Sequence, residues 1–492
     1  MPRSNLSLPI LLILVISFLS FSTIYTQKGN NNDNEVSFLS EYLTAIHSGS
    51  RSKINNFIRG HADSTFLEKI PFEVFTSFNL QYFYLSGGNG YDLLDIVNSG
   101  EKEVKALIKN KFTNASIELR IPVVDKNLMK INGFIEFKTI EGINKGNGIR
   151  KFHDNEIIEK LEKCLKLIVK DEEFSGTVLL AKNGKSIFQK AYGFSNKSDQ
   201  IENDINTKFN IASVGKIFTG VAIAQLAEKN KLSFDDTIDK YISSDWLNPE
   251  VSKKIKIKHL LTHTSGLGDY FRKLNTQCDK LIFRNLNDYK VLVSDQTLSF
   301  EPGTKWSYSN TGMLLLGVII EKITGIDYFD YLQKNVFNIA GMKNTGAFEK
   351  DRPVSNRAIG YIKDFTNGKT DWFENSFSRV VKGSPSGGCY STIIDLLNFC
   401  NALNSHKLIS EEYTEIVLSP KPELNSTFYG YGFFIQQNNL GKIIKHGGDG
   451  TGINAQLSCY INTGYTVVVL SNYGRPAAEI IDNLLFQILT SV

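Results

Sequence analysis

The fold of this chain is decided by residues 213–226, which read SVGKIFTGVAIAQL. Downstream of Lys216 the apolar residues keep a helical period with few charges, which predicts a helix buried at the centre of a domain. Ser213 and Lys216 are three residues apart, so their side chains share one face of that helix. A serine hydroxyl is a weak nucleophile and needs a base beside it. The segment therefore predicts a nucleophile, Ser213, and a base, Lys216.

Residues that favour helix starts precede this segment, namely Asn206, Thr207 and Asn210. They predict that Ser213 lies in or near the first turn, where free backbone N–H groups and the positive end of the helix dipole favour a developing oxyanion. The Ser-x-x-Lys spacing alone has low specificity, because residues 50–53 (SRSK) repeat it in a polar stretch.

Two tripeptides with polar side chains follow in order. They are Tyr308-Ser309-Asn310 and His446-Gly447-Gly448. The first lies in a turn-rich loop before an apolar helix predicted over 313–323, and the second ends a short strand predicted over 442–445. Each has a counterpart elsewhere, at 460–462 (YIN) and 47–49 (HSG), so neither is specific alone. The ordered trio in matching structural contexts is much rarer by chance.

With this trio the chain resembles the penicillin-recognising serine hydrolases. The similar branch holds class C β-lactamases, D-Ala-D-Ala carboxypeptidases, D-aminopeptidases and β-lactamase-like esterases, and it carries Ser-x-x-Lys, Tyr-x-Asn and Lys/His-x-Gly in this order. Residues 259–267, 301–312 and 386–396 are similar to further segments of the family. The resemblance covers residues 155–490. It departs at 339–342, where IAGM replaces the family's frequent Pro-Leu-Gly-Met, and this should alter a helix end and not the chemistry.

The resemblance implies the catalytic roles. Ser213 is the nucleophile, and Lys216 and Tyr308 together act as general base and acid, although the sequence leaves open which of the two holds the proton. The oxyanion hole of the family uses backbone N–H groups that correspond to Ser213 and Asp449. His263 suggests a Ser-His pair, but its segment is structural in the family. We expect no metal and no cofactor.

The resemblance also implies substrate-binding roles for Asn310, His446, Gly447, Gly448 and Asp449. Asn310 would orient the acyl amide or the Lys216 amine. His446 stands where class C β-lactamases carry Lys, which favours an esterase or a peptidase for small or D-configured acyl groups over a dedicated β-lactamase. Two alternatives are open for Asp449. Either its carboxylate repels anionic substrates, or its side chain turns outward and only its N–H contributes.

Composition supports a globular, multidomain protein. The chain has 492 residues, of which 41% are hydrophobic and 22% charged. The net charge of +4 is small and argues against a nucleic-acid partner. The five cysteines lack metal-ligand spacing, so we expect packing roles, with at least one thiol unpaired within the chain.

Five segments are expected along the chain: a signal peptide, a linker, a small α+β accessory domain, a second linker and a β-lactamase-like serine hydrolase domain. They are residues 1–26, 27–34, 35–140, 141–154 and 155–492. The signal is predicted from Arg3 and the apolar run 8–21. An uncleaved N-terminal anchor is the alternative, because the run approaches the ~18 residues that span a membrane. Both alternatives predict export, to the bacterial periplasm or cell envelope.

The accessory domain is predicted from two periodicities. Apolar positions at 38–46 and 54–58 fit helices, whereas alternation over 116–121 and 129–137 fits half-buried antiparallel strands. Helices followed by a sheet indicate an α+β unit, similar in outline to nuclear-transport-factor-2-like domains. We find no catalytic constellation in it.

The hydrolase domain is predicted as one antiparallel sheet of at least five strands with packed helices. A hairpin around Asn183-Gly184 comes first, and three strands precede a closing helix. The predicted elements are a helix at 155–169, strands at 177–181, 186–191, 442–445, 453–461 and 465–470, and a helix at 477–489. Ser213 should lie where the all-helical part meets the sheet.

These features predict an exported serine hydrolase that cleaves an ester or amide through a Ser213 acyl-enzyme. The expected partner is a small ester, amide or peptide, with cell-wall peptides as one candidate and no nucleic acid. Membrane contact is expected only if the N-terminal segment is uncleaved. The alternative function is a non-hydrolytic or regulatory penicillin- or peptide-binding protein of the cell envelope.

Overall fold

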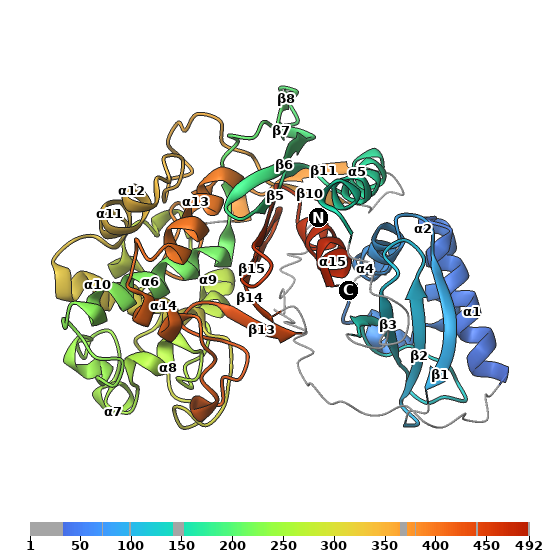
Figure 1. The fold of residues 1–492 in the computed structure, drawn as a ribbon. Helices are drawn as coiled ribbons and strands as arrows, with labels where there is room; N and C mark the ends of the chain where they lie inside the picture. Colours follow the sequence, from blue (N-terminus) through green and yellow to red (C-terminus); the bar gives the residue numbers. More distant parts are fainter. Residues whose placement is uncertain are drawn as a thin grey trace, which may run out of the picture.

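The computed structural model describes residues 33–70, 72–97, 100–140, 152–364, 371–378, 380–438 and 441–490. The predicted signal peptide and most of both predicted linkers lie outside the described residues. The fold is α+β, as predicted, with a small sheet in an N-terminal unit and a larger sheet in the part that follows (Figure 1).

The described residues of the N-terminal unit form four helices and an antiparallel sheet of order β1-β2-β3-β4. The elements are α1 (Asp33–His47), α2 (Arg51–His61), α3 (Ser64–Leu67), α4 (Phe72–Leu85), β1 (Tyr91–Val97), β2 (Glu103–Asn110), β3 (Ser116–Pro122) and β4 (Glu136–Thr139). The strand predicted over 116–121 is confirmed as β3, in which Ile117, Leu119 and Ile121 are fully buried, but Ser116 and Glu118 are buried as well, so it is more than half-buried. The strand predicted over 129–137 was wrong at its start. Met129 has a φ of 46° in a turn, and Ile131 forms isolated bridges with Ala62 and Val123, so the regular strand β4 begins only at Glu136.

The larger sheet has six antiparallel strands in the order β13-β14-β15-β16-β5-β6. The strands and the helices at its two chain ends are α5 (Asp154–Lys170), β5 (Gly176–Lys182), β6 (Lys185–Tyr192), β13 (Phe434–Asn438), β14 (Gly441–Gly450), β15 (Ile453–Tyr460), β16 (Tyr465–Ser471) and α15 (Ala477–Thr490). The predicted hairpin is confirmed, and Asn183 and Gly184 both have positive φ. The sequence analysis did not predict β13.

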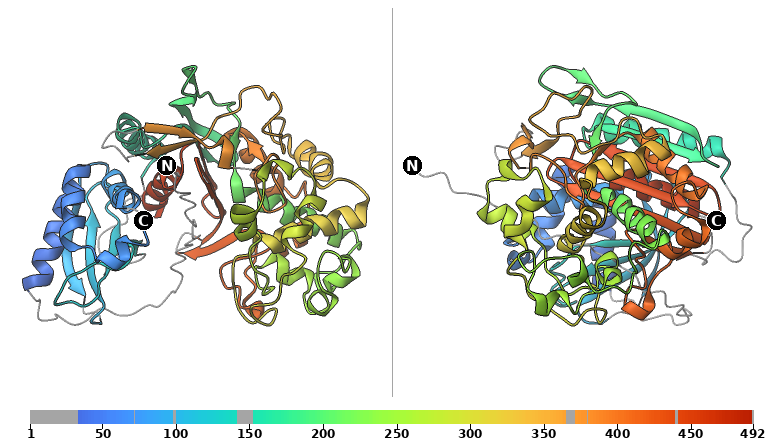
Figure 2. Two further views of the ribbon diagram at one scale, coloured as in Figure 1. Left: turned by 180° about the vertical axis from the view of Figure 1, so that it is seen from behind. Right: turned by 90° about the vertical axis from the view of Figure 1, so that its left-hand side faces the viewer.

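Helices cover both faces of this sheet. Figures 1 and 2 show that α6 (Lys216–Glu228), α10 (Asn310–Thr324) and α13 (Ile393–Asn404) lie on one face, whereas α5 and α15 lie on the other. Every residue of α6 from Lys216 to Ala227 is buried, as its sequence predicts. The short helix η1 (Ala212–Gly215) packs against β14 and β15. Ser213 therefore lies where the helical part meets the sheet.

The N-terminal unit packs on the second face of the sheet through α15 and α5. Apolar residues of α1, α4 and β3 form one continuous buried cluster with those of α5, α15 and β16. Polar contacts cross the same junction: Asn110 Nδ2 donates to Gln487 Oε1 at 2.8 Å, and Arg51 pairs with Glu173 at 2.9 Å. The layers are therefore the helical part, the six-stranded sheet, α5 with α15, and the N-terminal unit (Figure 2).

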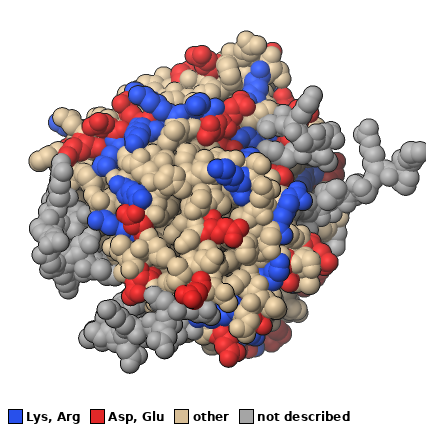
Figure 3. Space-filling view, turned by 90° about the vertical axis from the view of Figure 1, so that its right-hand side faces the viewer, with Lys and Arg blue, Asp and Glu red and all other residues tan. Residues whose placement is uncertain are grey.

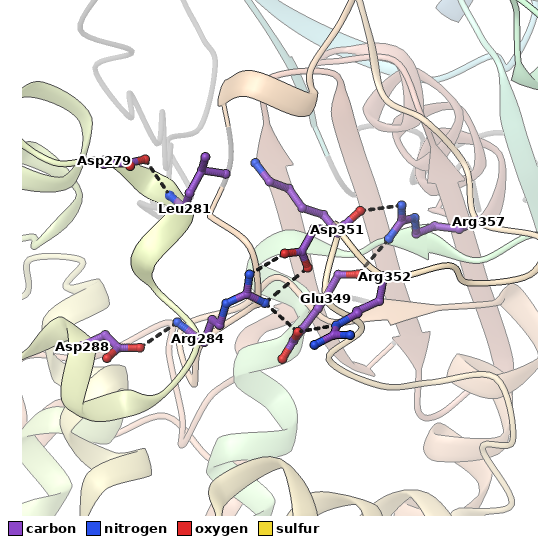
Figure 4. A network of polar contacts seen from close by, with 9 residues as sticks. Asp279, Leu281, Arg284, Asp288, Glu349, Asp351, Arg352 and Arg357 are labelled. Atoms are coloured by element: carbon purple, nitrogen blue, oxygen red, sulfur yellow. Dashed lines mark hydrogen bonds and ion pairs between the residues drawn. The ribbon is translucent and has the colours of Figure 1, made fainter.

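Charged residues of both signs occur on the face shown in Figure 3. On the face formed by the N-terminal unit, basic and acidic side chains are interspersed (Figure 3). In the helical part, Arg284 pairs with Glu349 at 2.7 Å and also with Asp351, which ties the loop before η4 (Leu286–Leu292) to the segment after α12 (Asn338–Ala340) (Figure 4). Within the described ranges, no helix is long and apolar enough to cross a membrane.

The cysteines are packed inside the protein, and four of the five are buried. Cys400 on α13 and Cys459 on β15 are in contact, with their sulfur atoms 2.9 Å apart. The described residues contain no group of His, Cys, Asp and Glu side chains that could hold a metal ion.

Candidate active site

The turn of residues 211–215 carries Ser213, the predicted nucleophile, and is here named the nucleophile turn; it is held in an unusual backbone conformation. Ala212 has a φ of 43°, which is uncommon for a residue other than glycine. The side chain of Asn210 fixes this turn, since its Oδ1 accepts a hydrogen bond from Ala212 N at 2.9 Å and its Nδ2 donates to the Gly388 carbonyl at 2.8 Å. Asn210, predicted as a helix-start residue, therefore shapes the loop before the nucleophile.

Lys216 is fully buried beside Ser213. Its Nζ lies 2.9 Å from Ser213 Oγ and donates a second hydrogen bond to the Ser386 carbonyl at 2.5 Å. Burial lowers the pKa of the Lys216 amine to about 7, against a smaller opposing effect of the Asp269 carboxylate. A large fraction of the amine is therefore uncharged near neutral pH.

Tyr308 completes the cluster. The Lys216 amine lies 4.8 Å from the centroid of the Tyr308 ring, and the Tyr308 hydroxyl interacts with the Ser213 side chain. Burial raises the pKa of the Tyr308 hydroxyl well above its usual value, so the phenol stays protonated at neutral pH. The structure thus brings together the three side chains that the sequence singled out as catalytic.

His263 packs against the Tyr308 ring and bonds to the loop that carries it. Its ring lies 4.3 Å from the Tyr308 ring, its carbonyl accepts from Ser307 N at 2.9 Å, and its Nδ1 accepts from Ser309 N at 3.2 Å. Burial lowers the pKa of His263 well below its usual value, so the imidazole is neutral. These contacts position the Tyr308 loop, and they give His263 a packing role.

Asn310 lies next to a carboxylate that the sequence analysis missed. Its Nδ2 donates to Asp269 Oδ2 at 2.6 Å. The Oδ1 atom of Asn310 is buried and has no hydrogen-bond partner within the described part of the chain. Burial raises the pKa of the Asp269 carboxyl, although its hydrogen bonds and Lys216 oppose this shift. The only signal for Asp269 was its place two residues after the family-like segment 259–267.

His446 is buried and neutral. The hydroxyl of Tyr429, another residue missed in the sequence analysis, lies 3.2 Å from His446 Nε2, and His446 Nδ1 lies 2.7 Å from the Gly447 carbonyl. A carbonyl only accepts, so these partners assign the proton to Nδ1. Burial lowers the pKa of His446 to about 3, with Lys216 adding to the shift. The predicted substrate-binding side chain is thus shielded from solvent.

The backbone around Gly448 passes close to the nucleophile turn. A Cβ atom at residue 448 would lie 2.1 Å from the Ile211 carbonyl oxygen. The prediction that residues 446–448 end a strand was wrong, because β14 continues to Gly450. Pairing with β13 stops at Lys445, so residues 446–450 are paired with a strand on the β15 side alone.

The Asp449 side chain points away from Ser213. Side chains alternate along a strand, so Gly448 faces the nucleophile turn and Asp449 faces the opposite side. There the Asp449 carboxyl is open to solvent but crowded by protein, which raises its pKa to about 6, and its charged neighbours are Arg475 and Glu479. Of the two alternatives for Asp449, the geometry supports the one in which only the N–H contributes.

Comparisons with known proteins show the family of this chain. The sequence model of the family described as Beta-lactamase matches residues 161–489. Penicillin-binding protein 4* of Bacillus subtilis (strain 168) is 30% identical over 326 residues, which cover 63% of this chain and 71% of that protein. A penicillin-binding protein structure from Bacillus halodurans is 33% identical, with a TM-score of 0.59, and the match covers 65% of this chain and 98% of that one.

One further solved structure is similar in fold alone. A D-stereospecific amidohydrolase from Streptomyces sp. has a TM-score of 0.53 at 20% identity, and the match covers 64% of this chain and 94% of that one.

Gly448→Ala tests the contact between β14 and the nucleophile turn. The added methyl group would force one of them to move, so covalent labelling of Ser213 by a fluorophosphonate should slow by about tenfold or more, with a loss of ~1–3 kcal/mol in stability. Gly450→Ala is the matched control, because the nearest atom to its Cβ, Ile453 Cδ1, is 3.5 Å away. A wild-type labelling rate in Gly448→Ala would contradict the contact.

Proposed function

Because the chain belongs to the beta-lactamase family, we propose that it is a serine hydrolase that cleaves an ester or amide through an acyl-enzyme on Ser213. The observation that supports this proposal most is the cluster of Ser213, a buried Lys216 2.9 Å away, and Tyr308. A hydroxyl becomes a useful nucleophile when an unprotonated base stands beside it, and the lowered pKa of Lys216 supplies that base.

In the acylation step, Ser213 Oγ attacks the carbonyl carbon as its proton passes to the Lys216 amine. We assign the base to Lys216 rather than Tyr308 because the raised pKa of the phenol keeps its proton in place. Tyr308 then delivers its proton to the leaving oxygen or nitrogen and is reprotonated from Lys216. The geometry supports this relay, since both groups lie next to Ser213.

The negative oxygen that forms in this step needs donors in place before the reaction. We propose the backbone N–H groups of Ser213 and Asp449, which belong to two segments packed against each other at Gly448. Water then attacks the acyl-enzyme with the same base, which releases the acid and restores Ser213.

Neutral esters or amides are the proposed substrates. The tripeptide His446-Gly447-Gly448 offers no positive charge to a substrate carboxylate. His446 is neutral and buried, and its two ring nitrogens already have partners. A dedicated β-lactamase or carboxypeptidase would need such a charge or a comparable donor. Small acyl esters and amides, including those of D-configured amino acids, fit this site better.

Export and domain organisation are part of the proposal. We propose that residues 1–26 direct export to the bacterial periplasm or cell envelope, that 35–140 form an accessory domain, and that 155–492 form the hydrolase domain. Support comes from the apolar run 8–21 and from a nucleophile site built wholly from residues after 209.

Ser213→Ala should abolish both covalent labelling by a fluorophosphonate and turnover of nitrophenyl esters, because the nucleophile is removed and little packing is lost. Labelling identified by mass spectrometry at Ser213, followed by turnover, separates the hydrolase from the alternative. A wild-type protein that is labelled by a penicillin probe but turns over no ester, D-aminoacyl amide, D-Ala-D-Ala peptide or cephalosporin would instead be a binding protein.

Lys216→Ala and Tyr308→Phe should each lower the acylation rate by roughly 10²–10⁴, the range for loss of a general base or acid. Both residues act on one proton, so the double variant should lose less than the product of the single losses. Stopped-flow measurement of acylation tests this expectation. Multiplicative losses in the double variant would show that the two residues act independently.

The pH dependence of kcat/KM follows from the state of Lys216. The base must be uncharged, and the amine loses its proton as pH rises through its pKa of about 7. The kcat/KM for a neutral ester should therefore increase as pH rises through about 7 and should be low at more acidic pH. An acid limb near pH 4, without any change near 7, would assign the base to a carboxylate.

Asp449→Asn should change kcat/KM by less than about twofold for neutral esters and carboxylate-bearing substrates alike, because the carboxyl lies on the face of β14 opposite Ser213. Parallel assays with a nitrophenyl ester and a D-Ala-D-Ala peptide measure the ratio. A selective gain on the peptide would place the carboxylate near the substrate.

A further inference from the structure

Asp269 is an acidic residue hydrogen-bonded to Asn310 of the candidate site. Neither the sequence motifs nor the family comparison assigns it a role. It lies in the loop between α8 (Ile257–Leu261) and α9 (Phe271–Gln277). Both oxygens of its carboxylate are engaged: Oδ1 accepts from Phe271 N at 2.9 Å, and Oδ2 accepts from Asn310 Nδ2 at 2.6 Å. The carboxylate thus joins this loop to the start of α10.

Neighbouring contacts make this junction rigid. Ser309 Oγ donates to the Gly268 carbonyl at 2.8 Å, and Tyr270 N donates to Thr311 Oγ1 at 3.0 Å. Residues 268–270 are therefore bonded to 309–311 position by position, directly after Tyr308. A change in the conformation of residues 268–270 should therefore shift Tyr308-Ser309-Asn310.

The carboxylate also dictates how the Asn310 amide is turned. An ionised carboxylate only accepts hydrogen bonds, so the NH₂ group of Asn310 must face Asp269 and its Oδ1 must face the other way. That Oδ1 is buried without a partner within the described residues. A buried acceptor without a donor is costly, so it is available for an N–H group that arrives during the reaction.

We propose that Asp269 is a positioning residue of the proposed hydrolase, which fixes the amide of Asn310 and whose negative charge acts on Lys216. This inference rests on the proposed function. Asp269 does not touch the reacting atoms; it acts through Asn310 and through its field at the amine. Its charge holds the protonated form of Lys216 in place between the two proton transfers.

Asp269 is the charged side chain that affects the pKa of Lys216, since the other titratable groups named below are uncharged at neutral pH. From the same loop come His263, which is neutral, and Tyr270, whose raised pKa keeps it protonated. Tyr308 and His446, from the other two motifs, are likewise uncharged at neutral pH. Loss of the Asp269 charge should therefore lower the pKa of Lys216, because the carboxylate stabilises the ammonium form.

The test is a set of pH profiles of kcat/KM on a neutral nitrophenyl ester. Asp269→Asn removes the charge at nearly constant volume, so we expect the acid limb to move to lower pH and the plateau to fall by about 10- to 100-fold. Asp269→Glu keeps the charge but moves it, so its acid limb should stay near that of the wild type while the plateau falls. Asp239→Asn, at an exposed position, is the matched control and should leave limb and plateau unchanged.

A cycle with Asn310→Ala tests the positioning step. If Asp269 acts through the amide, the double variant Asp269→Asn/Asn310→Ala should lose little more than Asn310→Ala alone. Thermal unfolding of each variant identifies any that do not fold, and Asp269→Glu then carries the test. Unchanged limb and plateau in Asp269→Asn, or fully multiplicative losses in the cycle, would overturn the inference. Absence of Ser213 labelling in the wild type would instead overturn the proposed function.

Discussion

Removal of one lysine amine from water is the constraint on which the rest of this structure depends. An ammonium group without full solvation is costly, and the protein meets that cost by shifting Lys216 toward its neutral form. The amine then needs only modest polar contacts, which Ser213 Oγ and the Ser386 carbonyl supply. A pair of residues that would be unreactive on a surface is thereby suited to the proposed roles of nucleophile and base.

Deep burial of Lys216 requires close packing of backbone around α6, and glycines make that approach feasible. A Cβ at Gly220 would lie 2.2 Å from the Tyr431 carbonyl oxygen, and one at Gly387 would lie 2.3 Å from the Ala212 carbonyl oxygen. Gly387 and Gly448 thus let two backbone segments approach residues 211–212, and Gly220 lets a third approach α6. The same close packing helps to bury the Lys216 amine, so the glycines contribute to its lowered pKa although they carry no reactive group.

Local patterns in the sequence predicted the parts of the site that depend on local structure. The helical period of residues 213–226 predicted the buried helix, and the Asn183-Gly184 turn predicted the hairpin at one end of the sheet. Asp269 and Tyr429 escaped because their importance comes from which loops meet in space, and no periodicity records that. The direction of the Asp449 side chain escaped for a related reason. A one-residue difference in strand phase reverses a side chain, and the predicted strand stopped short of that residue.

The N-terminal unit matters to this sheet in a way that its lack of motifs concealed. Residues 467–470 of β16 read VVVL and are all fully buried, which is typical of a strand covered on both faces. Val468 and Leu470 belong to the apolar cluster on the helical side, whereas Val467 and Val469 belong to the cluster shared with the N-terminal unit. The strand is thus held between two cores. The sheet that positions the Gly448 backbone against Ser213 therefore depends on packing at both of its faces, including the face that the N-terminal unit helps to cover.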